Sequence, residues 1–90
     1  MRTKQVQGAT VTDMGDEAPF LPNYTAVVIN TGSNQDTLQF GDASTGPFNT
    51  AKKVDGTDAI IPAGGSAEVV ISGRYAAIEN GAGSLVILGN

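Results

Sequence analysis

Twelve glycines and four prolines divide this 90-residue chain into short segments, and no segment shows the sustained apolar spacing of a helix. Between these breaks, β-branched and aromatic residues gather in short runs bounded by Gly, Asn, Asp and Pro. Such runs are typical of antiparallel strands in a sandwich or a barrel. The sequence therefore predicts an all-β fold, a small antiparallel β-sandwich or barrel of about seven strands.

The first part of the chain, residues 1–22, differs from the rest. Its short polar runs could pair as an edge strand, but they are followed by Phe20 and Leu21 between two prolines. Proline resists regular structure and keeps the residue before it extended. We predict an extended N-terminal arm over residues 1–22 and a β-sandwich domain over residues 23–90.

Seven runs in the second part predict the strands of the sandwich. They are residues 24–30, 37–40, 48–54, 57–61, 66–72, 74–79 and 84–88. The run at 24–30 is apolar on both faces, as in a central strand. Alternation predicts that Leu38 and Phe40 point together into the core and that Tyr75 also lies on a core face. The Asp-Gly pair at 55–56 favours a two-residue type I′ hairpin turn.

Composition excludes several classes of function. The chain has no cysteine and no histidine, so it lacks disulfides, zinc–thiolate sites and the base of a Ser-His or Cys-His pair. We predict no enzymatic activity and no cofactor. The net charge is −4, and the five basic residues form no stripe that could neutralise phosphates, which predicts no nucleic-acid partner. No run reaches the roughly 18 apolar residues of a membrane span, and an anionic membrane would repel the chain.

Two chemical alternatives remain weak. A Ser-Lys pair would have to use Lys52 or Lys53, which no motif supports. Calcium prefers oxygen ligands, and two groups of acids lie close together in the sequence. They are Asp13, Asp16 and Glu17, and Asp55 with Asp58. Neither group has EF-hand spacing, and Asp is common in turns for local hydrogen bonding, so we predict no metal site.

A domain of this size usually needs disulfides, a metal or association to supplement its core. With cysteine and histidine absent, association with another protein surface is the route that the sequence leaves most open. A well-packed monomer is the alternative.

A series of turn motifs resembles a known family. An Asn-Thr-Gly turn at 30–32 and Phe-Gly-Asp at 40–42 precede a Pro-Ala-Gly-Gly turn at 62–65, and a Leu-Val-Ile-Leu strand closes the chain at 85–88. This pattern, over about residues 24–89, resembles small β-sandwich modules of tailed-phage virions, especially head decoration or cement proteins and capsid fibre bases.

The resemblance implies a structural protein of a bacteriophage virion. Such a protein would bind the outer surface of the capsid, bridge neighbouring subunits of the major capsid protein and act as a homo-oligomer, with a trimer favoured. It would be made in the host cytoplasm and reside on the capsid surface. The arm would then supply the contacts, with Met14, Phe20 and Leu21 as apolar anchors and Arg2 and Lys4 pairing with capsid acids.

The competing hypothesis is a receptor- or glycan-binding module of a fibre or tail. It would use polar loops such as residues 41–47 together with exposed aromatic rings. The absence of tryptophan counts against it.

Overall fold

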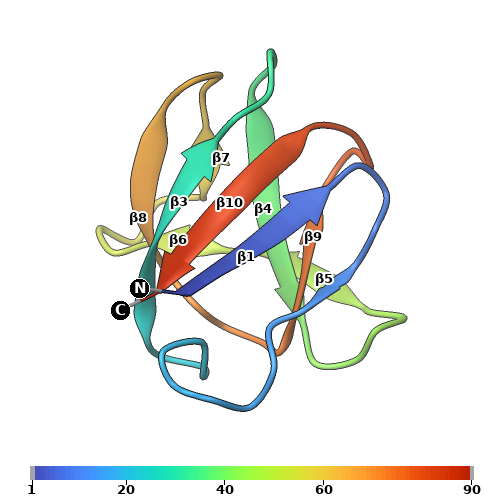
Figure 1. Cartoon of the computed structure of the whole chain (residues 1–90), viewed down its shortest axis with the longest axis vertical. Helices are drawn as coiled ribbons and strands as arrows, with labels where there is room; N and C mark the ends of the chain where they lie inside the picture. Colours follow the sequence, from blue (N-terminus) through green and yellow to red (C-terminus); the bar gives the residue numbers. More distant parts are fainter. Residues whose placement is uncertain (1, 90) are drawn as a thin grey trace.

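The computed structural model describes residues 2–89, which form ten strands and no helix (Figure 1). The strands are β1 (Arg2–Gln7), β2 (Thr12–Asp13), β3 (Thr25–Asn30), β4 (Asp36–Gly41), β5 (Phe48–Thr50), β6 (Lys52–Lys53), β7 (Ile60–Ile61), β8 (Ser66–Val70), β9 (Tyr75–Ile78) and β10 (Ser84–Gly89). Within this part of the chain there is accordingly no helix long and apolar enough to cross a membrane.

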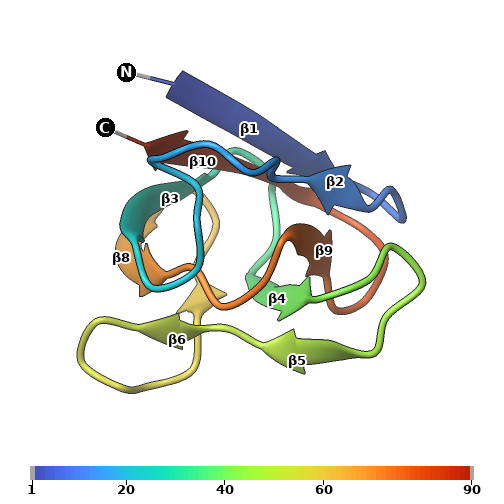
Figure 2. The same cartoon turned by 90° about the horizontal axis from the view of Figure 1, so that it is seen from below.

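The strands form two antiparallel sheets packed on one core (Figures 1 and 2). Sheet A has the order β1-β10-β3-β8-β6. Sheet B has the order β2-β9-β4-β5, and β7 pairs with β4 beside it. The prediction of a small all-β antiparallel sandwich or barrel is confirmed.

The seven predicted strands correspond to the eight strands β3–β10, since the predicted strand at 48–54 forms two separate strands, β5 and β6. Its first half, β5, belongs to sheet B, and its second half, β6, belongs to sheet A. Between them, Ala51 is buried and its amide donates to the Leu38 carbonyl at 2.9 Å. The chain therefore passes from one sheet to the other here and closes one side of the sandwich.

Alternation predicts the core correctly in β4, where Leu38 and Phe40 are both buried. In β9 the prediction was wrong by one residue. Ala76 and Ile78 face the core, whereas Tyr75 lies on the outer face and is only half-buried. In a short Tyr-Ala-Ala-Ile run, both faces are apolar enough that alternation does not distinguish them.

The turn at Asp55 and Gly56 also differs from the prediction. Gly56 has a φ of +88°, but Asp55 is not left-handed, so the turn is not type I′. The Gly56 amide donates to the Lys53 carbonyl, and the Lys53 amide donates to the Thr57 carbonyl. This is a three-residue loop with glycine in the left-handed position, the next most common way to close a hairpin.

Asn30 joins the two turn motifs of the sequence. Its buried side chain donates to the carbonyls of Asn34 and Ile61, at 2.8 and 2.9 Å, and accepts from the Gly32 amide at 2.8 Å. Its backbone pairs with the Pro-Ala-Gly-Gly turn through Gly64 and Gly65. The Asn-Thr-Gly motif therefore fixes one end of the sandwich through buried hydrogen bonds.

The described part of residues 1–22 is not a separate arm, which corrects the predicted domain boundary. β1 pairs along its whole length with β10, from Arg2 opposite Gly89 to Gln7 opposite Ser84. Val6 is fully buried in the common core. The segment is an integral edge strand followed by a loop that closes one end of the same sandwich (Figure 2).

Candidate functional site

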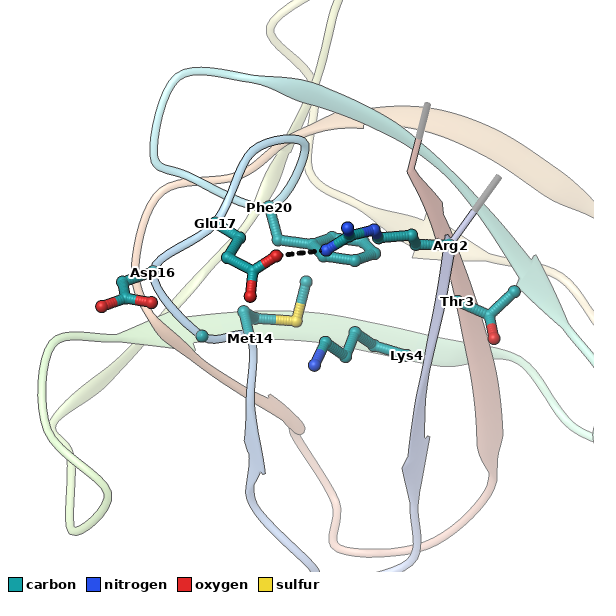
Figure 3. A pocket seen from close by; sticks show the side chains of 8 residues that line it. Arg2, Thr3, Lys4, Met14, Asp16, Glu17 and Phe20 are labelled. Atoms are coloured by element: carbon teal, nitrogen blue, oxygen red, sulfur yellow. Dashed lines mark hydrogen bonds and ion pairs between the residues drawn. The ribbon is translucent and has the colours of Figure 1, made fainter.

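Four of the five residues predicted to bind a partner line one hollow at the edge of the sandwich (Figure 3). Arg2 and Lys4 come from β1, whereas Met14 and Phe20 come from the loop between β2 and β3. The hollow has a volume of about 350 Å³. Leu21 is half-buried and does not line it.

The alternation of β1 explains why two cations border a hollow. Val6 faces the core, and side chains two residues apart share a face of a strand, so Lys4 and Arg2 follow it on the inner face. The Lys4 ammonium lies 5.6 Å from the centre of the Phe20 ring, in cation–π range. The Arg2 guanidinium donates to Glu17 across the mouth of the hollow.

Met14 and Phe20 form the floor of the hollow and belong to the core, with 1% and 2% of their surfaces exposed. The Met14 amide donates to the Arg74 carbonyl at 2.7 Å, which fixes the start of the loop. The prediction that these two side chains project as anchors is therefore wrong. They close the open end of their own sandwich, where an apolar surface would otherwise meet water.

Two ion pairs fix the loop that carries the floor. Hydrogen bonding from Arg2 lowers the pKa of Glu17, and hydrogen bonding from Arg74 lowers the pKa of Asp13. Asp13 and Glu17 belong to one of the two acid groups considered for calcium, and each of them is paired with an arginine. Within residues 2–89, no group of three or more acidic side chains is placed to hold a metal ion.

A second candidate surface lies on the outer face of sheet A. Val27 is opposite Leu88, and Ile29 is opposite Val86, so that four aliphatic side chains form a two-by-two block. We call these four residues the aliphatic block. Val27 is 42% exposed and the other three are half-buried.

The surroundings of the aliphatic block are polar but almost uncharged. On the β1 side, Thr3 and Gln5 flank it, and on the β8 side Ser66 and Glu68 do so. The sequence contained the signal for this surface, because the run at 24–30 is apolar on both faces. That pattern predicts a central strand, and β3 is central in its sheet, yet its outer face is open to solvent at Val27.

The loop predicted for glycan contact, residues 41–47, borders a hollow of about 470 Å³. Phe40 is the one aromatic residue among those that line it, and Phe40 is buried. Its ring is therefore not presented for stacking on a sugar.

These features define the class of the protein as a small antiparallel β-sandwich with an open aliphatic face and a charged hollow at one edge strand. No family model, no curated protein and no solved structure matches the chain.

Proposed function

We propose that this chain is a non-catalytic binding module that holds another protein surface through the aliphatic block of sheet A. The observation that carries the proposal is the outward placement of Val27, Ile29, Val86 and Leu88 in one contiguous group. An exposed apolar patch rimmed by polar residues is typical of a protein–protein contact.

Covering the aliphatic block would contribute favourably to docking. Burying an aliphatic side chain completely stabilises by about 1.5–3 kcal/mol, so covering the exposed 42% of Val27 contributes about 1 kcal/mol. The three half-buried neighbours add smaller amounts. Because Glu68 is the one acid directly beside the block, little charge has to be removed from water when a partner covers it.

The narrower proposal concerns the partner. The resemblance of residues 24–89 to decoration modules of tailed phages supports a structural role on the outside of a capsid, with the major capsid protein as partner. There the chain would bridge neighbouring subunits, as a trimer, and reside in the virion after synthesis in the host cytoplasm. The aliphatic block would supply the apolar part of that contact.

The test is co-sedimentation of the purified chain with capsid shells that lack it, using Val27→Asp and the matched control Val54→Asp. Val54 is 53% exposed and lies in the loop after β6, away from the block. We expect the wild type and the control to sediment with the shells and Val27→Asp to bind at least about tenfold more weakly. Equal binding by all three proteins would refute the role of the block, and failure of the wild type to sediment would refute the capsid partner. Light scattering on the unbound chain tests the trimer.

A further inference from the structure

The backbone of β1 is open where it passes the hollow. The Gly8 amide donates to the carbonyl of Gly83, the residue before β10, so the even-numbered residues of β1 direct their backbone groups toward β10. The odd-numbered residues direct theirs to the other side, where Thr12 donates to the Gln5 carbonyl at 2.7 Å. Thr3 is the next such residue, and the two-residue strand β2, whose Thr12 reaches Gln5, pairs with β9 and not with β1.

Thr3 therefore presents backbone to the hollow. Its side chain points away from the other lining side chains (Figure 3), yet it belongs to the lining. Among residues 2–89, β1 pairs with no strand other than β10. The N–H and C=O of Thr3 form a short free edge beside an apolar floor made by Met14 and Phe20.

We propose that this hollow binds an extended segment of a partner chain, which adds to β1 as a short strand at Thr3. An apolar side chain of that segment would cover Met14 and Phe20. A carboxylate two residues away, on the same face of the added strand, would pair with Lys4.

Charge decides what the occupant is. Arg2 already pairs with Glu17, and the carboxylate of Asp16, at the rim, points away from the other lining side chains (Figure 3). Lys4 points into the hollow and takes part in none of the ion pairs formed by the described residues. A second copy of this chain, pairing β1 with β1, would bring two Arg2 and two Lys4 side chains together. The fitting occupant is therefore an acidic, apolar segment of a different protein.

This inference stands apart from the aliphatic block. The hollow lies on the inner side of β1, and the block lies on the outer face of sheet A. Thr3 also flanks the block beside Leu88, so separate variants keep the two proposals apart: Lys4→Gln tests the hollow, and Val27→Asp tests the block.

The experiment is an NMR titration of the full chain with three capped pentapeptides. Thr-Leu-Thr-Glu-Thr places Leu and Glu on one face of a strand, Thr-Leu-Glu-Thr-Thr places them on opposite faces, and Thr-Leu-Thr-Lys-Thr reverses the charge. We expect the first peptide to shift the backbone amides of Thr3 and Lys4 and the methyl group of Met14. The other two should bind at least about tenfold more weakly.

Two variants complete the test. Lys4→Gln should weaken the first peptide about tenfold, and Lys52→Gln, in the opposite edge strand β6, should leave its affinity unchanged. The proposal is overturned if the Thr3 amide does not move with the first peptide or if the lysine peptide binds as well. It is equally overturned if Lys4→Gln, with an otherwise unchanged spectrum, binds like the wild type. The comparison between the three peptides needs only the wild-type protein, so it tests the proposal even if Lys4→Gln folds poorly.

Discussion

Phe20→Ala distinguishes a core residue from a docking anchor. The ring is 2% exposed and lies so close to β10 that a Cβ on Gly89 would come within 2.8 Å of its Cε1 atom. Replacing a buried Phe by Ala costs about 3–5 kcal/mol. We expect about 3 kcal/mol, the lower end, because the adjoining hollow gives the neighbouring side chains room to relax. A domain of this length has a free energy of unfolding of roughly 5–13 kcal/mol, so the loss is a large fraction of the total.

The assay is urea unfolding followed by circular dichroism, together with thermal unfolding. A loss of about 3 kcal/mol should lower the Tm by about 12–24 °C and leave the urea m-value unchanged. Leu21→Ala is the matched control, because Leu21 is the half-buried neighbour, and it should cost less than about 1.5 kcal/mol. If Phe20→Ala costs less than about 1 kcal/mol, the ring is not a core element, and the role of an exposed anchor is restored.

Three further predictions concern the turns and the surface charges. Gly83→Ala should cost more than about 2 kcal/mol in thermal unfolding, because φ is +99° and the new Cβ would lie 2.2 Å from Asp36; a loss below about 1 kcal/mol contradicts this. Asn30→Ala should cost about 2 kcal/mol, since it leaves the buried Ile61 carbonyl and the part-buried Asn34 carbonyl and Gly32 amide without their partner, and unchanged urea unfolding would refute it. The hydrogen bond from Arg74 lowers the pKa of Asp13 from its usual value of 3.8. The ionised Asp13 therefore stabilises the folded state above the unfolded-state pKa, and this stabilisation is lost as the pH falls through the folded-state pKa. Asp13→Asn should therefore flatten the dependence of Tm on pH below about pH 4, and identical curves for both proteins would contradict this.

Much of the fold could be predicted because its strands carry local signals. Alternation identified Leu38 and Phe40 as core, and the Pro-Ala-Gly-Gly motif at 62–65 identified a turn, in which the Gly65 amide donates to the Pro62 carbonyl. These features depend on neighbours in the sequence. The same reasoning could not tell which face of β9 packs on the core, because its small and aromatic residues make the two faces similarly apolar.

The predicted arm failed for a different reason. β1 has one apolar inward residue, Val6, and its partner β10 is at the other end of the chain, so no local pattern reports the pairing. The prolines around Phe20 favoured an extended path, and that prediction was wrong. The Phe20 amide donates to the Glu17 carbonyl and the Tyr24 amide donates to the Leu21 carbonyl, so the segment forms two turns that place Phe20 in the core. The structure brings Arg2, Lys4, Met14 and Phe20 around one hollow, where Met14 and Phe20 form the floor and do not project. Their contact with a partner stays a prediction.

The charges of β1 connect the architecture of the edge to the proposed recognition. A free sheet edge invites pairing with any other strand, and inward-pointing charged residues are one of the protections that β proteins use. Lys4 lies where an apolar residue would extend the core beyond Val6, and its charge disfavours an apolar or basic strand beside the hollow. A segment that brings a carboxylate to Lys4 removes that obstacle, because neutralising the ammonium lowers the cost of covering the floor. Lys4 therefore disfavours the pairing of most strands with this edge, including β1 of a second copy of the chain. The same side chain favours an acidic segment.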